Sequence, residues 1–373
     1  MSFESVPVWM MIAGFLLVLG PLVTVHEFGH YLVGRLFGVK ADAFSVGFGK
    51  ELVGHTDKRG TRWKISALPF GGYVQFKGDM NPASAADHSA LDGLDAAERA
   101  ECFQVKPLWQ RALIVAAGPV TNFIVAIAIL AAFNMTYGRV EIPAVVAGLV
   151  EGGAAEQAGL EIGDRVVSVD GNPLEDFNDL RNRVFSDPGG TIALTVAKPD
   201  GARERLEFAI PSTIERDRFG NEFRVGRMGM VADSNQMRRI PVGPVESVTL
   251  AVRQTGDIVE MMVQGIWQIV TGRRPVEELG GPLKIAKFSG EQLSLGATAF
   301  VGFIAMISIN LAFINLLPIP GLDGGHLAFY AAEAVRRKPL GRRSQEWAFR
   351  TGIALVLALM LFVTVNDLIG FLA

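Results

Sequence analysis

The chain has 373 residues, half of them hydrophobic, and a net charge of −3. Its mean hydropathy of +0.31 is too high for an ordinary soluble protein of this length and indicates a membrane protein with a soluble part. The lack of a basic excess argues against nucleic acid as a partner. The single cysteine, Cys102, excludes an intramolecular disulfide framework.

The first predicted element is an apolar helix over residues 1–38. Residues 6–25 contain no charged side chain, and the preceding residues lack the basic start of a cleaved signal peptide. This pattern predicts a retained membrane span that contacts the lipid bilayer directly.

The motif HEFGH ends this first span. Positions i and i+4 share one face of a helix, so His26 and His30 can bind one zinc ion while Glu27 activates a zinc-bound water. The alternative is a pair of interfacial histidines at the end of a span. Ionisable groups are costly at membrane depth, and this cost favours the zinc interpretation.

Residues 39–107 form a loop rich in Lys and Arg, which predicts a cytoplasmic location. Within it, residues 61–77 (TRWKISALPFGGYVQFK) predict a membrane-associated β-hairpin with its turn near Pro69–Gly72. A hairpin beside the zinc site would offer a strand edge to an unwound substrate. We expect this edge to be formed by Tyr73, Val74, Gln75 and Phe76. The alternative is a purely structural hairpin packed on the span ends.

A second span is predicted at residues 108–138, and the segment after it is soluble in character. Residues 142–211 alternate short β-rich runs with turn signals and one helical run, which indicates a small α+β domain. Residues 245–271 place apolar side chains at helical spacing. They predict an amphipathic helix on the membrane surface or on the spans.

The third and fourth spans are predicted at residues 295–326 and 350–371. The two loops richest in Lys and Arg, 39–111 and 336–350, should both be cytoplasmic. Both chain termini and the 139–291 segment should then lie outside. The fold class is therefore a four-span α-helical membrane protein with a cytoplasmic-side β-hairpin and one extracytoplasmic α+β domain.

This topology brings the ends of spans one and three together, and so it suggests the third zinc ligand. Asp323 lies in the otherwise uncharged stretch NLLPIPGLDGGH, where two prolines break the helix and three glycines permit close backbone approach. It is the strongest candidate. His326 follows closely and is interpreted as an outer or interfacial group. Asn310 and Asn315 either pack helices or bind substrate, with the second role favoured for Asn315.

Three motifs in this order resemble the site-2 protease family of intramembrane zinc metalloproteases, and most closely its bacterial regulator of sigma-E protease branch. They are HEFGH on the first span, AAGPVTN on the second and NLLPIPGLDGGH on the third. The likeness continues through PFGGYVQFKGD (69–79) and GGPLKIAK (280–287).

The resemblance implies a zinc metalloendopeptidase with zinc bound by His26, His30 and Asp323, with Glu27 as catalytic base and with Asn315 near the substrate. It implies that residues 142–211 are a PDZ domain, because EGGAAEQAGLEIGDRVVSVDG is similar to the PDZ pattern. The best-studied members of this branch carry two PDZ domains, and the 212–245 stretch is too short for a second.

The implied substrates are single-span membrane proteins already trimmed outside, such as an anti-sigma factor, or remnant signal peptides. The implied location is the inner membrane of a Gram-negative bacterium, with periplasmic termini and the active site near the cytoplasmic side. Two alternatives are a PDZ-bearing adaptor with an inactive metal site and a different membrane zincin with a glutamate as third ligand. The presence of Glu27 and of every candidate ligand argues against the adaptor. The other zincin is disfavoured because no later span offers a glutamate and Asp323 fits better.

Overall fold

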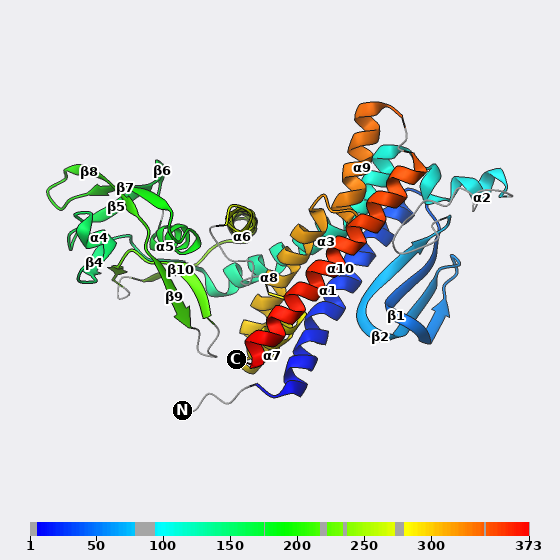
Figure 1. Cartoon of the computed structure of the whole chain (residues 1–373), viewed down its shortest axis with the longest axis horizontal. Helices are drawn as coiled ribbons and strands as arrows, with labels where there is room; N and C mark the ends of the chain where they lie inside the picture. Colours follow the sequence, from blue (N-terminus) through cyan, green and yellow to red (C-terminus); the bar gives the residue numbers. More distant parts are fainter. Residues whose placement is uncertain are drawn as a thin grey trace. The chain divides into compact units, whose positions relative to one another are not determined.

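The computed structural model describes residues 6–78, 94–174, 176–216, 222–233, 237–272, 280–338 and 341–372. The chain divides into two compact units, and most of their elements are labelled in Figure 1. We call Val6–Leu130 together with Leu279–Ala373 the helical unit, and Ala131–Glu278 the inserted unit.

The helical unit is built on four helices that are long and apolar enough to cross a membrane. These stretches are Val8–Leu36, Leu108–Tyr137, Ala297–Leu316 and Trp347–Ile369, and they agree with the four predicted spans. The helices of the unit are α1 (Val8–Leu36), α2 (Ala96–Ala100), α3 (Leu108–Tyr137, whose last turns belong to the inserted unit), α7 (Pro282–Ser294), α8 (Ala297–Leu316), α9 (Asp323–Arg336) and α10 (Arg342–Leu372), with a 3₁₀ turn at Phe103–Val105.

A break after α8 creates the turn that leads to Asp323. Helix α8 ends at Leu316, and α9 begins at Asp323 itself. Gly324 and Gly325 have no room for a Cβ, which would overlap the carbonyl groups at the end of α8 and in the turn, those of Leu316 and Ile319 among them. The predicted break at the prolines is therefore present, and the double glycine lets α9 start against it.

Strands β1 (Ala41–Thr56) and β2 (Arg62–Phe76) form a strongly bent sheet. The tight turn between them lies at residues 57–61, where the Asp57 carboxylate accepts hydrogen bonds from the backbone N–H groups of Arg59 and Thr61. The predicted turn near Pro69–Gly72 is wrong. Residues 62–66 and 72–76 both pair with β1 and not with one another. Residues 61–77 contain one long strand, β2, and its partner is β1, which precedes it in the chain.

The last part of β2, residues 72–76, is an edge. Its residues pair with 41–46 on one side, and among the described residues no strand pairs with its other side. The aromatic core beneath this sheet includes Phe44, Phe76 and Phe103, which pack with Tyr31 of α1. The edge is thereby held against the helix that carries the HEFGH motif.

The inserted unit contains a four-stranded antiparallel sheet in the order β6-β5-β7-β8. Its strands are β3 (Arg139–Glu141), β4 (Val146–Leu149), β5 (Arg165–Val169), β6 (Asn172–Pro173), β7 (Thr191–Ala197), β8 (Arg203–Ala209), β9 (Ser212–Arg216), β10 (Glu222–Gly226), β11 (Met230–Ala232) and β12 (Arg238–Ile240), and its helices are α4 (Ala154–Gln157), α5 (Phe177–Ser186) and α6 (Pro244–Val270).

The core of this unit lies between the sheet and α5. Leu180, Ile192 and Leu194 are fully buried in it, which matches the alternation seen in the sequence. The core also includes Met228, and β11 pairs with β4. The folded unit thus continues beyond residue 211, because β4 obtains its partner strand from the later segment.

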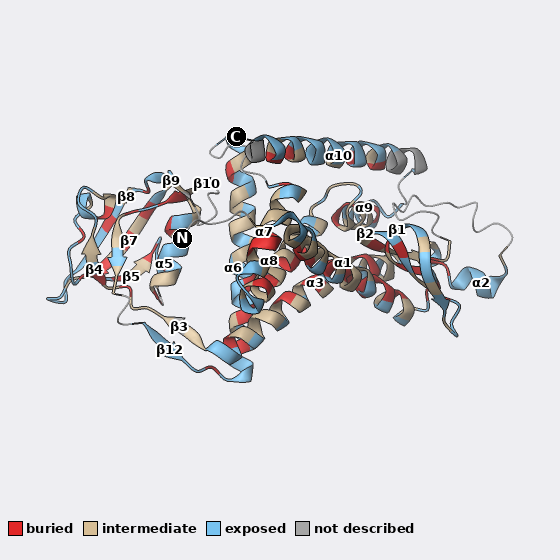
Figure 2. Cartoon of the chain, turned by 90° about the horizontal axis from the view of Figure 1, so that it is seen from below, coloured by how far each residue is buried: buried red, intermediate tan, exposed pale blue. Residues whose placement is uncertain are grey.

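Helix α6 confirms the predicted helix at residues 245–271. It begins with Pro244 in its first turn, a position that suits proline because the N–H there has no partner within the helix. Much of α6 is exposed or partly exposed within the unit (Figure 2), and several of its apolar side chains are among the exposed ones. Val248 and Val252 are 49% and 51% exposed.

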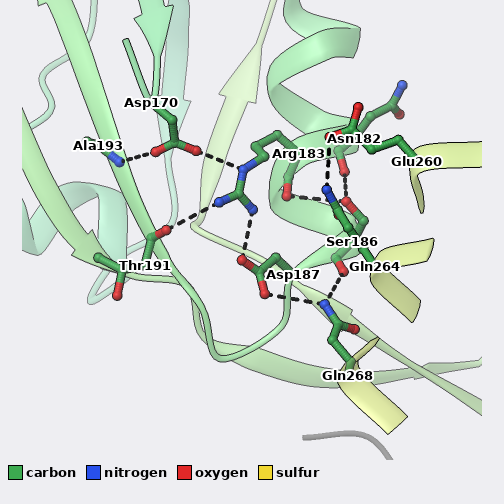
Figure 3. Close-up of polar contacts among 10 residues, drawn as sticks. All are labelled: Asp170, Asn182, Arg183, Ser186, Asp187, Thr191, Ala193, Glu260, Gln264 and Gln268. Atoms are coloured by element: carbon green, nitrogen blue, oxygen red, sulfur yellow. Dashed lines mark hydrogen bonds and ion pairs between the residues drawn. The ribbon is translucent and has the colours of Figure 1, made fainter. Parts of the chain in front are cut away.

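A hydrogen-bond network ties α6 to the small domain (Figure 3). Gln268 donates from Nε2 to the Ser186 carbonyl at 3.1 Å and to the Asp187 carboxylate at 3.4 Å. Arg183 donates to Asp187 at 2.9 Å and to Asp170 at 2.8 Å. Burial lowers the pKa of Arg183, but the two carboxylates raise it overall, so the guanidinium stays charged and the network intact.

Candidate metal centre

Three side chains from two helices converge in the helical unit. His26 and His30 lie one turn apart on α1, and Asp323 is the first residue of α9. Their ligand atoms form a small triangle: Nε2 of His26 to Nε2 of His30 is 3.2 Å, His26 Nε2 to Asp323 Oδ2 is 3.1 Å, and His30 Nε2 to Asp323 Oδ2 is 3.5 Å. Sequence reasoning therefore named three residues that the fold brings together.

The triangle fits a zinc ion. With metal–ligand bonds of about 2.0 Å in a tetrahedron, adjacent ligand atoms lie about 3.3 Å apart. The three edges of the triangle, 3.1, 3.2 and 3.5 Å, bracket that value. Three protein ligands leave the fourth tetrahedral position for water or substrate, which is the arrangement of hydrolytic zinc sites.

Each histidine is oriented by a polar group on α3. Nδ1 of His30 lies 2.8 Å from the Ile114 carbonyl, to which it can only donate. Its proton is therefore on Nδ1, and Nε2 is free to bind metal. Nδ1 of His26 lies 3.2 Å from the side-chain amide of Asn122, a fully buried residue whose backbone carbonyl accepts a hydrogen bond from Ser308.

Glycines let α1 and α3 approach closely enough for these contacts. A Cβ on Gly29 of α1 would lie 2.6 Å from the Ala117 carbonyl oxygen of α3. A Cβ on Gly118 would overlap Nε2 of His30 and lie 2.8 Å from Nε2 of His26. Because Cβ contacts below about 3 Å do not occur without displacement, both helices need glycine at these two positions.

Glu27 lies beside the triangle and outside the set of three ligand atoms. Its Oε2 accepts a hydrogen bond from the backbone N–H of Val74, at 3.2 Å, on the open edge of β2. A Cβ on Gly72 would be 2.6 Å from the Ser45 carbonyl oxygen, so glycine is needed for this edge to lie where it does.

A cavity of about 290 Å³ contains the triangle and Glu27. Of the predicted substrate residues, Val74, Phe76 and Asn315 line it, together with His326. Tyr73, Gln75 and Asn310 are not among its lining residues. The ring of Tyr73 stacks on Phe48 with a centroid separation of 6.0 Å. Phe76 is mainly a core residue, 5% exposed, with its ring stacked on Phe103.

Two residues of the centre had only a weak signal in the sequence. The Gly118–Pro119–Asn122 stretch of AAGPVTN indicated a kinked span with one polar contact, with packing and function equally favoured. The structure places Asn122 against His26 and Gly118 against both histidines. An asparagine and a glycine within a predicted span were the available signals, but their partner could not be inferred from spacing alone.

Comparison with known proteins identifies the class. The model of Peptidase family M50 matches residues 14–359. "Putative zinc metalloprotease Atu1380" of Agrobacterium fabrum is 46% identical over 96% of this chain and 95% of its own length. A protein of Mesorhizobium japonicum with the same description is 43% identical over 95% of this chain and 98% of its own length. "Metalloprotease MmpA" of Caulobacter vibrioides is 35% identical over 96% and 95%.

The chain is a zinc metalloendopeptidase with four helices that could span a membrane. It belongs to peptidase family M50, the site-2 protease family, as the three sequence motifs predicted. Among solved structures, the PDZ domain of an SdrC-like protein from Listeria monocytogenes matches 27% of this chain and 93% of that chain, with 19% identity and a TM-score of 0.18. The assignment of a PDZ domain stays a prediction.

Proposed function

We propose that His26, His30 and Asp323 bind the catalytic zinc ion and that the enzyme cuts single-span membrane proteins within or near their membrane segment. The observation that carries the proposal is the triangle of ligand atoms, whose edges suit tetrahedral zinc, inside a cavity lined by the membrane helices α1, α3 and α8. Zinc bound there supplies a Lewis acid that polarises the scissile carbonyl and lowers the pKa of water.

The chain's own residues perform the proton transfers. Glu27 accepts the proton of the attacking water and delivers it to the nitrogen of the leaving amine. Asn315, which lines the cavity, would donate an amide N–H to the substrate carbonyl oxygen. Asn310 stays a weaker candidate for substrate contact, because it does not line the cavity.

Asn122 and the Ile114 carbonyl hold the two histidines ready to bind. When Nε2 of a histidine ligates a metal, Nδ1 carries the proton and needs an acceptor. The Ile114 carbonyl is such an acceptor for His30. The Asn122 amide lies with Nδ2 at 3.2 Å from Nδ1 of His26, and its buried Oδ1 has no hydrogen-bond partner among the described residues. We propose that this amide is turned over when His26 binds metal, so that Oδ1 accepts the Nδ1 proton.

The open edge of β2 is proposed to bind the substrate as an added strand. A helix in lipid satisfies its own backbone and hides its peptide bonds, so the substrate must unwind before hydrolysis. An unwound segment then needs new partners for its N–H and C=O groups. Residues 73–76 offer a strand edge that pairs with no other strand among the described residues, and the Val74 N–H on this edge donates to Glu27.

Changing Val74 to proline tests this edge. Val74→Pro removes the edge N–H that donates to Glu27, while proline is tolerated on an edge strand. We expect the rate of cleavage of a single-span substrate to fall about tenfold or more. A loss of this size corresponds to roughly one or two lost hydrogen bonds. Zinc content should not change. Val74→Ala, which keeps the N–H, should cut at nearly the wild-type rate. Equal rates for the proline and alanine variants would rule out strand addition here.

The setting we propose is the inner membrane of a Gram-negative bacterium, with both termini periplasmic and the active site near the cytoplasmic side. The excess of Lys and Arg in the loops 39–111 and 336–350 supports this orientation. The proposed substrates are an anti-sigma factor trimmed by an earlier protease, in regulated intramembrane proteolysis, or remnant signal peptides. The inserted unit, as a single PDZ domain, would screen substrate size or bind an exposed C-terminus, and the apolar face of α6 would lie on the membrane surface.

The ligand assignment is tested by changing Asp323 to alanine in the full chain purified in detergent. We expect Asp323→Ala to lose both zinc and cleavage of a tagged single-span substrate, since two histidines alone do not complete the site. Zinc is counted by atomic absorption and cleavage by gel electrophoresis. An Asp323→Ala protein that retains one zinc per chain would refute the proposed ligand set.

A further inference from the structure

The GGPLKIAK motif at residues 280–287 takes no part in the zinc site, and it receives a buried carboxylate from the last span. Asp367 of α10 is 1% exposed. Its two oxygens accept hydrogen bonds from the backbone N–H of Gly281, at 3.1 Å, and of Lys284, at 3.0 Å. Asp367 therefore caps the N-terminus of α7 from a different helix. Nζ of Lys284 lies 3.8 Å from the same carboxylate.

The cap requires close contact between α7 and α10. A Cβ on Gly281 would lie 2.7 Å from Oδ2 of Asp367 and 3.0 Å from the carbonyl oxygen of Val363. The neighbouring Gly280 is different, because a Cβ there would meet only the Lys284 side chain, at 3.6 Å or more. The contact between α7 and α10 therefore requires glycine at position 281 but not at position 280.

Helix α7 is in turn fixed to α1, which carries His26 and His30. A Cβ on Gly14 of α1 would be 2.7 Å from the Ser289 carbonyl group of α7. A Cβ on Gly290 would be 2.9 Å from the backbone nitrogen of Met11. Two glycines facing each other's backbone make this a tight helix pair, the kind of contact that holds helices together in lipid.

The other end of α10 packs on the turn before Asp323. A Cβ on Gly352 would overlap the Pro320 carbonyl oxygen and lie 2.6 Å from its carbon. The ring of Phe349 lies 4.8 Å, centroid to centroid, from that of His326. Because α10 packs closely against one side of this turn, the position of the turn depends on the position of α10.

Between these two contacts α10 is mostly exposed. Leu357, Leu359 and Leu361 are 59%, 49% and 67% exposed. Gly352 and Asp367 are fifteen residues apart, a length of about 22 Å of helix. Apolar side chains gain nothing by leaving lipid for a helix surface, so the position of α10 is set by its two end contacts.

We propose that Asp367 is a positioning residue for the zinc site. By capping α7, which is fixed to α1, it sets the position of α10 and through it the turn that places Asp323 against His26 and His30. This inference rests on the proposed ligand set. It also explains a buried carboxylate in the last span, since such a group is costly without a specific use.

The test measures the zinc dissociation constant of the full chain in detergent by competition with a chelator. We expect Asp367→Ala and Gly281→Ala to raise the Kd about tenfold, in the range found when groups that support metal ligands are changed. Gly280→Ala and Leu368→Ala, an exposed position on α10, should stay within about twofold of wild type. Asp367→Ala and Gly281→Ala break the same contact. The zinc Kd of their double variant should therefore be no higher than that of the single variant with the higher Kd.

The same samples separate this role from a merely structural one. If Asp367 only stabilises the fold, its loss lowers the Tm of the zinc-free protein and leaves the zinc Kd unchanged, and that result would overturn the proposal. Asp367→Asn, which keeps the shape and one acceptor oxygen, supplies the comparison if the alanine variant does not fold. Wild-type protein that binds no zinc would instead overturn the ligand set itself.

Discussion

Glu27→Gln should abolish cleavage and leave the zinc ion in place. Glutamine has the shape of glutamate, but its amide cannot accept the proton of the attacking water or return it to the leaving amine. Glu27 contributes none of the three converging ligand atoms, so its replacement removes no proposed metal ligand. Its partner, the Val74 N–H, can still donate to the amide oxygen. We expect the cleavage rate to fall by about 10³-fold, a typical loss for a general acid–base group.

The measurement pairs single-turnover cleavage with zinc content in the same preparation. His26→Ala serves as the comparison, since it should lose zinc and cleavage together. Two results would contradict the assignment of Glu27. Cleavage at the wild-type rate would mean that another group is the base, and loss of zinc from Glu27→Gln would mean that the carboxylate belongs to the ligand set.

Gly118→Ala should prevent zinc binding, although it adds a single methyl group far from any ligand in the sequence. The new Cβ would occupy the space of Nε2 of His30 and crowd Nε2 of His26, the two atoms proposed to bind the metal. Alanine is a better helix former than glycine by about 1 kcal/mol, so α3 itself should not be weakened. The expected effect is a loss of essentially all zinc and activity from a protein that remains folded.

Gly20→Ala is the matched control, because a Cβ at that position of α1 would meet nothing within 4 Å. Circular dichroism would check that both variants keep their helix content, and zinc content and cleavage would be measured side by side. If Gly118→Ala binds zinc as well as Gly20→Ala does, then the histidine rings have room to move and the close approach of α3 is not needed for the centre.

The sequence predicted the parts of this molecule that depend on short-range pattern or on topology. Uncharged runs defined the four spans, helical spacing paired His26 with His30, and the direction of the spans pointed to Asp323 although 292 residues separate it from His30. These inferences rest on a repeat period, on segment length and on the distribution of Lys and Arg, and none of them depends on the details of packing.

What the sequence did not predict depends on contacts between distant segments. The window 61–77 contains turn residues and alternation, yet its strand pairs with residues upstream, and local turn propensity could not reveal that choice. Asn122 at His26 and Asp367 at the start of α7 are polar groups whose partners lie on other helices. A polar residue in a predicted span indicates that it has a polar partner, but it does not indicate which residue that partner is.

The division into two units has an evolutionary consequence. Every residue proposed for the reaction lies in Val6–Leu130 or Leu279–Ala373, and the segment between them folds on a core of its own. That segment can therefore be lengthened, duplicated or exchanged without moving a ligand, as is usual for a domain inserted at a permissive point. Changes confined to that segment would then leave the proposed hydrolytic apparatus as it is.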